Sequence, residues 1–308
     1  MHGWIILDKP SGITSAHAVA KVKKILRHPT AQDPAQPLRG SQDDKIKIGH
    51  AGTLDPLASG VLPLALGEAT KTIPYMMDAD KEYAFTVTWG EERDTDDSAG
   101  KIINKSEKIP EKSEINAIIR HFIGKIMQLP PAYSALKIGG ERAYDLARNG
   151  IAPDLKAREV RVDFLSAPTL LSAGGAKTDF RCACGKGTYI RSLARDMGRE
   201  LGCFGYISRL RRTRVGKFDQ TGAISLEMLE EMVHKGGLGF LQPLESALDD
   251  IPAIHLAVDQ AARLQRGQNV VLPLNTDSST VIARCNGKPV AVCKWKDGQL
   301  WPTRVFNL

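Results

Sequence analysis

Cysteine is scarce in this chain, and its arrangement excludes a disulfide framework. The five cysteines form an odd number and include no C-x-x-C pair. A zinc site would need two further ligands at suitable spacing, and the neighbouring sequence offers none. Cys182 and Cys184 stand two residues apart and therefore face the same side of a strand. We expect them to be small buried core residues.

Long apolar runs are also missing. No stretch of about 18 apolar residues occurs, so no transmembrane helix is expected. The segment Met1–Lys9 reaches the charged pair Asp8 and Lys9 too soon to hold the apolar core of a signal peptide. These two absences predict a cytoplasmic protein that makes no membrane contact.

Two familiar ligand-binding motifs are incomplete. The stretch Gly185–Asp196 resembles a phosphate-binding loop, but Lys186 is followed by Gly187 where a P-loop needs Ser or Thr. A nucleotide cofactor is therefore disfavoured. A calcium loop that began at Asp94 would need a glutamate eleven residues later, where the chain has Lys105. We expect no metal at this acidic turn.

Acidic residues are outnumbered by basic ones, which gives a formal net charge of +7. The excess is concentrated between Arg181 and Lys217, where ten Lys or Arg face two acids. The stretch from Asp80 to Glu114 is acidic instead, with ten acids and six basic residues. A concentrated basic segment is typical of proteins that bind a phosphate backbone, although a solvated basic surface fits the charge equally well.

The length of 308 residues suits one large domain and a smaller one. We place the boundary near Asp249–Pro252, which gives domains of residues 1–250 and 251–308. The second holds one short helix and several alternating segments, which predicts a small β-rich module. Residues 28–44 are rich in Pro, Gln and Asp without apolar periodicity, and we expect a mobile surface loop there. Nothing indicates an obligate oligomer, so we expect a monomer.

Periodicity predicts the local elements around these landmarks. Alternating apolar residues predict strands at residues 4–7, 81–89 and 178–183. Helical spacing predicts helices at residues 16–26, from residue 113, within residues 140–150 and after the glycine turn at residues 185–187. Thr14 or Ser15 is the expected N-cap of the first helix, and Arg191 and Arg195 share a face of the last.

The most informative segment is Lys47–Gly60. It places Asp55 in a glycine-rich loop, directly before a proline and an apolar run, with His50 five residues upstream. A carboxylate held on a rigid loop beside apolar walls can act as a nucleophile or a base rather than as a solvated surface charge. Asp55 is therefore the first candidate for chemistry.

This segment and others in the same order resemble the bacterial TruB family of tRNA pseudouridine-55 synthases, within the pseudouridine synthase superfamily. The matching segments are Gly3–Ser15, Gly49–Gly60, Gly67–Lys71, Lys81–Tyr83, Gln128–Lys137, Gly187–Leu193 and Leu210–Arg212. They cover residues 3 to 245. Residues 265–268 and 301–306 resemble an RNA-binding PUA domain.

The resemblance implies a fold and a reaction. The fold is an α+β catalytic domain around a mixed, mostly antiparallel central sheet, followed by a PUA-like domain. The reaction breaks the N-glycosidic bond of a uridine, rotates the base and rejoins it through C5. The implied partner is the T-arm stem-loop of tRNA, whose target base is flipped out of the stack. No cofactor or metal is implied.

The resemblance also implies roles for individual residues. Asp55 corresponds to the catalytic nucleophile, Arg191 to the arginine that pairs with it, and Tyr83 to the tyrosine that packs on the flipped base and can take a proton. His50 corresponds to the residue that fills the space the base leaves, and Leu210 to an apolar contact with the base. Further RNA contacts are expected from Lys9, Lys71, Arg211, Arg212 and Arg214.

Two other functions fit parts of the sequence. One is a guide-RNA-dependent pseudouridine synthase, which would need accessory proteins. The other is a non-catalytic protein that binds or folds tRNA. The presence of Asp55, Tyr83 and Arg191 argues against the second, because a pure binder gains nothing from a carboxylate in a phosphate-rich site.

Overall fold

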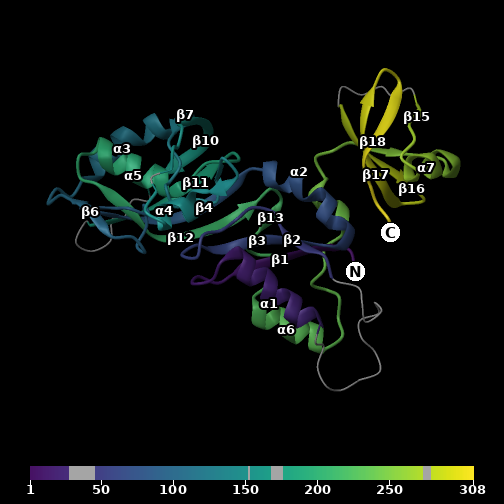
Figure 1. Ribbon diagram of the computed structural model, residues 1–308, viewed down its shortest axis with the longest axis horizontal. Coiled ribbons are helices and arrows are strands. Elements are labelled where there is room, and N and C mark those ends of the chain that lie inside the picture. The colour runs from purple at the N-terminus through teal and green to yellow at the C-terminus, as the bar shows by residue number, and fades with distance from the viewer. Residues whose placement is uncertain (28–45, 152, 168–175, 273–278) are drawn as a thin grey trace.

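The computed structural model describes residues 1–27, 46–151, 153–167, 176–272 and 279–308 (Figure 1). The loop expected at residues 28–44 lies outside the described residues. A large sheet and its helices make up most of the chain, and a small β-rich part follows at one end, close to both termini. No helix in the described ranges is long and apolar enough to cross a membrane.

The large sheet is mixed and mostly antiparallel, as expected, and has nine strands among the described residues. Its path runs β1 (Gly3–Lys9), β3 (Ser59–Leu66), β12 (Gly205–Val215), β4 (Lys81–Trp89), β11 (Lys177–Cys184), β10 (Arg158–Ser166) and β7 (Gly124–Gln128). The short β2 (Ile48–His50) pairs with β3, and β13 (Phe218–Asp219) pairs with β12. The β12–β3 pair is parallel and every other pair in this sheet is antiparallel.

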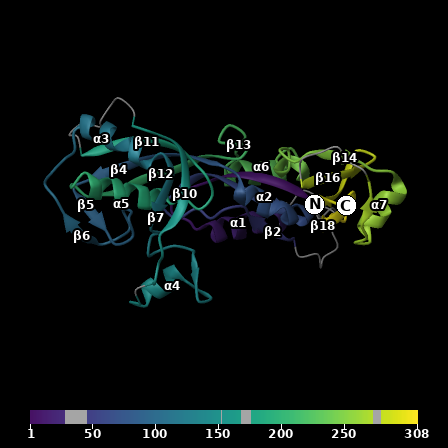
Figure 2. The same cartoon turned by 90° about the horizontal axis from the view of Figure 1, so that it is seen from above.

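Helices and small hairpins surround this sheet. The helices are α1 (Ser15–Arg27), α2 (Ile73–Asp78), α3 (Lys112–Ile119), α4 (Ala143–Arg148), α5 (Ile190–Glu200) and α6 (Leu226–His234). Three 3-10 turns are η1 (Gly67–Thr72), η2 (Arg120–Phe122) and η3 (Leu244–Ala247). Two hairpins pair β5 (Glu91–Arg93) with β6 (Ile102–Lys105) and β8 (Lys137–Ile138) with β9 (Glu141–Arg142). Figure 2 shows the α4 segment extending away from the sheet.

Alternation along the strands builds two apolar layers. The larger core packs one sheet face against α1, α3, α5 and α6, with Phe85, Cys182 and Leu193 among its buried members. The second lies on the other face, where Trp4 and Met76 meet residues of the C-terminal part. Burying each large apolar side chain contributes about 1.5–3 kcal/mol, so these layers fix where the loops between strands emerge.

The C-terminal part has a sheet of its own, with strand order β14 (Ala253–His255), β16 (Thr280–Cys285), β17 (Lys288–Lys296), β18 (Gln299–Val305) and β15 (Val270–Val271). Helix α7 (Val258–Gln265) packs on it, and Leu264 and Ala291 are fully buried in its core. Phe306 is 1% exposed and lies in the layer shared with the large domain. Lys71 Nζ also donates to the Val305 carbonyl at 2.7 Å, so the two parts are joined by specific contacts.

The expected helices and strands are present, with ends that differ by a few residues. Thr14 caps α1, because its Oγ1 accepts from the backbone N–H of His17 at 3.0 Å. Cys182 and Cys184 are both buried on the same face of β11, as predicted. The helix predicted within residues 140–150 is shorter, because two glycines at its start form the turn between β8 and β9.

Candidate active site

Asp55 lies in the loop between β2 and β3, and this loop is anchored at both ends. Ala51 and Leu54 are buried in opposite apolar layers. The Gly12 N–H donates to the Pro56 carbonyl at 2.7 Å and ties the loop to the turn after β1. Gly60 has a φ of 102°, and a Cβ at this position would collide with the backbone of Arg212. The glycine is therefore needed where the loop enters β3.

Ser15 at the start of α1 fixes the residue before Asp55. Its Oγ accepts from the Leu54 N–H at 2.8 Å and donates to the Leu54 carbonyl at 3.0 Å. Ser15 is 2% exposed, so both backbone groups are satisfied away from water. One hydroxyl thus clamps the peptide beside the candidate nucleophile.

Arg191 joins Asp55 to two other segments. Its Nε donates to Asp55 Oδ2 at 2.9 Å, its Nη1 to the Thr95 carbonyl at 2.8 Å and its Nη2 to the Tyr133 carbonyl at 2.9 Å. A guanidinium presents its donors in a fixed fork, so two carbonyls that hold its ends also set the direction of Nε. Arg191 therefore aims the Asp55 carboxylate.

The two members of this pair differ in exposure. The Arg191 side chain is 4% exposed, and the Asp55 side chain is 34% exposed. Asp97 Oδ2 lies 3.9 Å from Arg191 Nε and adds a second negative charge. The buried arginine holds one carboxylate oxygen, while the exposed side of Asp55 leaves room for a substrate. This arrangement suits a nucleophile that is held but not covered.

Two of the basic residues expected to contact RNA, Lys9 and Arg212, are buried, and their RNA contacts stay predictions. Lys9 is fully buried, and its Nζ donates to the carbonyls of Pro10 and Ile13. Arg212 is 1% exposed, and it donates to the carbonyls of Val61 and Gly52. Both side chains hold segments beside the Asp55 loop through these hydrogen bonds to backbone carbonyls.

Lys9 still acts on the site through its charge. Burial lowers the pKa of Lys9 to about 8, with Asp55 opposing the shift and Arg212 adding to it. A cation that is costly to bury stays protonated at neutral pH because a carboxylate lies close by. Lys9 and Asp55 are thus electrostatic partners without a direct hydrogen bond between them.

Tyr83 and Leu210 lie on the face of the sheet that carries this site. Tyr83 is paired with Arg212 across β4 and β12, and it packs against the core that contains Leu210. Burial raises the pKa of Tyr83 to about 12, although the nearby Arg212 opposes the shift. The ring is therefore neutral at pH 7, which suits stacking on a base better than action as a phenolate.

His50 ends β2 and stands before the Asp55 loop. Burial, and then the charge of Arg212, lower its pKa. Its Nδ1 atom is buried and has no hydrogen-bond partner within the described residues. A neutral imidazole with an unused ring nitrogen is a group that can accept a contact from an incoming ligand.

The remaining basic candidates are each paired within the protein. Arg211 binds Asp8 through two nitrogens, at 3.0 and 2.8 Å. Arg214 donates to Glu82 at 2.6 Å, and Lys71 binds Glu68 at 2.7 Å as well as Val305. These contacts do not bring them to Asp55, and their expected RNA contacts stay predictions.

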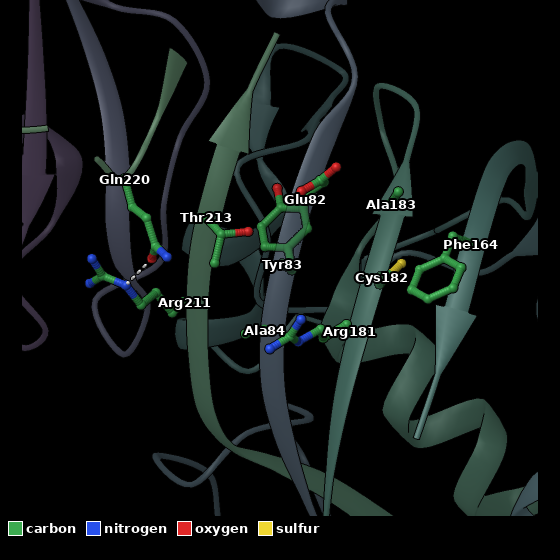
Figure 3. A pocket seen from close by; sticks show the side chains of 10 residues that line it. All are labelled: Glu82, Tyr83, Ala84, Phe164, Arg181, Cys182, Ala183, Arg211, Thr213 and Gln220. Atoms are coloured by element: carbon green, nitrogen blue, oxygen red, sulfur yellow. Dashed lines mark hydrogen bonds between the residues drawn. The ribbon is translucent and has the colours of Figure 1, made fainter. Parts of the chain in front are cut away.

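A pocket of about 530 Å³ lies on the large sheet (Figure 3). The side chains that line it come from β4, β10, β11, β12 and the segment after β13, and they are Glu82, Tyr83, Ala84, Phe164, Arg181, Cys182, Ala183, Arg211, Thr213 and Gln220. The dashed line in Figure 3 marks the bond from Arg211 Nε to Gln220. Asp55 and Arg191 do not line this pocket, but Tyr83, the residue predicted to pack on the base, does.

Sequence reasoning missed the residues that hold the walls of the site. The Gln128 side chain accepts from the Tyr189 N–H at 2.8 Å and donates to its carbonyl at 3.1 Å. Ser192 Oγ donates to the Leu129 carbonyl at 2.8 Å. Both residues lie in segments that resemble the family, Gln128–Lys137 and Gly187–Leu193, but neither segment indicated which residues they bind. Among the described residues, no cluster of three or more His, Cys, Asp or Glu side chains could hold a metal ion.

Comparison with known proteins agrees with this geometry. The description "TruB family pseudouridylate synthase (N terminal domain)" matches residues 41–190. "tRNA pseudouridylate synthase B C-terminal domain" matches residues 191–249, and "Pseudouridine synthase II TruB, C-terminal" matches residues 252–306. The last match begins one residue before β14.

Two relatives named tRNA pseudouridine synthase B resemble the whole chain. The protein of Nitrobacter winogradskyi is 48% identical over 317 residues, which cover 100% of this chain and 83% of that protein. The protein of Rhodopseudomonas palustris is 48% identical over 318 residues, which cover 100% of this chain and 81% of that protein.

Solved structures share the fold. A Cbf5–Nop10–Gar1 complex contains a chain that is 28% identical, with a TM-score of 0.67 and coverage of 95% of this chain and 78% of that one. An archaeal box H/ACA sRNP Nop10–Cbf5 complex gives 25% identity, a TM-score of 0.70 and coverage of 98% and 85%. The 48% identity of the two relatives over the whole of this chain, together with the family match to residues 41–190, shows that the chain belongs to the TruB family of pseudouridylate synthases.

Proposed function

We propose that this chain is an isomerase that converts the T-loop uridine at position 55 of tRNA to pseudouridine. The Asp55–Arg191 pair is the main support for this function. The buried guanidinium holds the partly exposed carboxylate, with 2.9 Å between Arg191 Nε and Asp55 Oδ2. The names of the relatives supply the substrate class. The net charge of +7 suits a polyanionic substrate.

The proposed reaction keeps every non-hydrogen atom of the uridine and exchanges one hydrogen with water. The target base leaves the stack, and the Asp55 carboxylate attacks C1′ of its ribose as the N1–C1′ bond breaks. The freed base turns, C5 bonds to C1′, and the carboxylate departs. The C5 proton is lost and N1 gains a proton, so the product is an isomer and no cofactor is consumed.

Other residues near Asp55 prepare this reaction. Tyr83 offers an aromatic face for the flipped base, and its raised pKa of about 12 keeps it neutral during catalysis. Leu210 packs in the same core and offers an apolar surface. His50 fills the space that the base leaves in the RNA. We expect His50→Ala to weaken T-arm binding or slow base flipping more than it slows bond cleavage.

The decisive experiment uses a T-arm stem-loop that carries tritium at C5 of the target uridine. Bond formation at C5 must release the tritium to water. We expect rapid release by the wild type and none above background by Asp55→Asn, while both proteins bind the stem-loop with similar affinity. Glu231→Gln is the control, because this exposed carboxylate pairs with Lys235 on the same helix, α6, and belongs to none of the predicted site residues.

Two outcomes would contradict the proposal. Appreciable tritium release by Asp55→Asn would remove Asp55 as the nucleophile. Tight binding of tRNA by a wild type that releases no tritium would indicate a different target RNA or a protein that only binds RNA.

A guide-dependent enzyme is the second candidate, because the structural neighbours include Cbf5 complexes with Nop10 and Gar1. The relatives at 48% identity carry the name of the tRNA enzyme, and this comparison favours the stand-alone reaction. Activity of the purified monomer on the stem-loop, without added RNA or protein, decides between them. We place this activity in the cytoplasm.

A further inference from the structure

Two arginines on α5 bind the same pair of segments, one helical turn apart. Arg191 donates to the carbonyls of Thr95 and Tyr133, as described above. Arg195 Nη1 donates to Asp96 Oδ2 at 3.0 Å, and its Nη2 donates to the Leu129 carbonyl at 2.9 Å. Both side chains are buried, at 4% and 6% exposure. The second arginine thus repeats the arrangement of the first without touching Asp55.

Asp96 occupies a backbone conformation that needs support. Its φ is 59°, in the left-handed region that residues other than glycine rarely adopt. The carboxylate is buried, and its strongest ion pair is with Arg195. The backbone N–H of Asp96 donates to Arg93 and its carbonyl accepts from Ile207, so the turn is closed on both sides. Such conformations persist only where the surroundings hold them.

The geometry links this turn to Asp55. The Thr95 carbonyl that accepts from Arg191 belongs to the same peptide plane as the Asp96 nitrogen. Rotation about the Asp96 N–Cα bond, away from the left-handed region, therefore turns that carbonyl relative to Arg191. Loss of this acceptor would free one end of the guanidinium fork and misdirect the Nε that holds Asp55.

We propose that Asp96 and Arg195 form a positioning pair, which fixes the Thr95 carbonyl and thereby aims Arg191 at Asp55. Neither residue touches the reacting atoms. The inference rests on the proposed function, because its consequence is a loss of the chemical step. It places a supporting ion pair behind Asp55 and Arg191 and explains why α5 has a second buried arginine.

The ionisation of Asp96 gives this pair a signature in the pH profile. Burial raises the pKa of Asp96 to about 6, and Asp196 adds to the shift. The positive groups that oppose it are Arg195 and then Arg191 and Arg199. Asp96 is an anion above pH 6 and takes a proton as the pH falls below 6. The ion pair with Arg195, and with it the rate of the chemical step, should then decline on the acid side of about pH 6.

The test compares Asp96→Asn with Glu92→Gln under single-turnover conditions at saturating T-arm stem-loop. Glu92 is a matched control, since it is a buried carboxylate of the same hairpin that pairs with Arg199 of α5 but has no link to Thr95. We expect Asp96→Asn to lower the rate at pH 7.5 by about tenfold to a hundredfold, with stem-loop affinity within about twofold of wild type. Glu92→Gln should keep the wild-type rate.

The pH profile separates positioning from a general loss of structure. The wild type and Glu92→Gln should both lose rate below about pH 6, and Asp96→Asn should lose this dependence. An equal rate loss in both variants, or an acid limb that persists in Asp96→Asn, overturns the proposal. If Asp96→Asn does not fold, Arg195→Lys replaces it, because lysine keeps the charge but cannot bind both Asp96 and Leu129 as a fork.

Crystal structures of the two variants provide a readout that does not depend on activity. We expect the Thr95 carbonyl to leave Arg191 in Asp96→Asn and to stay in Glu92→Gln. An unchanged Arg191 in Asp96→Asn overturns the inference even if the wild type is active. A wild type without isomerase activity overturns the proposed function instead, so the two failures are distinguishable.

Discussion

At the scale of single residues, the site depends on buried cationic side chains that are each hydrogen-bonded to neighbouring oxygen atoms. Lys9 is the clearest case, because its ammonium is enclosed and its pKa falls to about 8. Arg191 and Arg212 are also buried, and the N–H groups of each donate hydrogen bonds to backbone carbonyls or to a carboxylate. A buried cation left without such partners would cost several kcal/mol. The carbonyls around Asp55 thus matter as much as the charges.

The lowered pKa of Lys9 predicts a pH dependence of stability. Between pH 8 and about 10.5 the folded state holds fewer protons at Lys9 than the unfolded state does, so its contribution to the free energy of unfolding rises with pH. Below pH 8 both states are protonated and the full burial cost is present. Relative to Lys9→Met, the wild type should gain up to about 3 kcal/mol across this window.

Urea unfolding of both proteins at pH 7.5 and pH 10 measures this difference. Lys81, whose pKa is also lowered to about 8, is common to both proteins and cancels. If the free energies of unfolding of the two proteins change by the same amount between these pH values, the pKa of Lys9 is not lowered in the folded state.

At the scale of elements, α1 and α5 position the reactive loop from two sides. Ser15, the first residue of α1, satisfies both backbone groups of Leu54, and Arg191, near the start of α5, holds Asp55 itself. Both contacts come from helix starts that are packed into the large core, where Ala18 and Leu193 are fully buried. The Asp55 loop is therefore held in place by hydrogen bonds from α1 and α5 rather than by contacts within the loop itself.

Ser15→Ala tests this support. Removing the hydroxyl leaves the Leu54 N–H and carbonyl buried without partners, which costs about 1–3 kcal/mol for each unsatisfied group. We expect a loss of stability in urea unfolding and a slower single-turnover rate with unchanged stem-loop affinity. Thr14→Ala is the control, because this exposed N-cap should cost about 1 kcal/mol without affecting the rate. Equal rates in the two variants would show that Asp55 does not depend on α1.

The sequence predicted the elements and the central residues better than it predicted which face they occupy. The glycine-rich motif singled out Asp55, the family resemblance implied Arg191 as its partner, and the structure joins them. The run Leu210–Arg212 could not be assigned, because β12 contains two register shifts, after Ile207 and after Arg212. A single extra residue reverses which side chains face the core. Arg211 and Arg212 are consecutive and therefore point to opposite faces, and the shift before them hides from the sequence that Arg212 is the buried one.

The backbone carbonyls that bind Arg191 also could not be predicted from the sequence. The carbonyls of Thr95 and Tyr133 bind Arg191, but any residue type supplies a carbonyl, so no motif marks them. They lie 96 and 58 residues from Arg191, and the sheet brings them together. Long-range contacts of this kind follow from topology rather than from local pattern.

At the scale of the whole molecule, the C-terminal part is joined to the catalytic part by packing as well as polar contacts. Phe306 is 1% exposed in the apolar layer that also contains Trp4 and Leu244. The Asn307 N–H donates to Glu68 at 2.7 Å, and Arg284 pairs with Glu245 at 3.3 Å. Deleting residues 253–308 would expose this apolar layer, so deletion alone would mix lost RNA contacts with lost stability.

Phe306→Ala separates these effects. Truncating a buried phenylalanine costs about 3–5 kcal/mol, and here the cost should fall on the attachment of the C-terminal part rather than on the Asp55 loop. We expect faster proteolysis near residues 249–252 and weaker binding of full-length tRNA. Turnover of the isolated T-arm stem-loop should stay close to that of the wild type, since the contacts of Asp55 and Arg191 lie within the catalytic part.

Leu308→Ala, two residues further along and 59% exposed, is the matched control and should behave as the wild type in all three assays. If Phe306→Ala lowers stem-loop turnover as much as it lowers tRNA affinity, the two parts act on the active site as one unit. If Phe306→Ala changes neither stem-loop turnover nor tRNA affinity, tRNA binding does not depend on the firm attachment of the C-terminal part. Between these outcomes, a selective loss of tRNA affinity would show that a rigid junction lets the second domain hold the RNA while Asp55 acts on a single base.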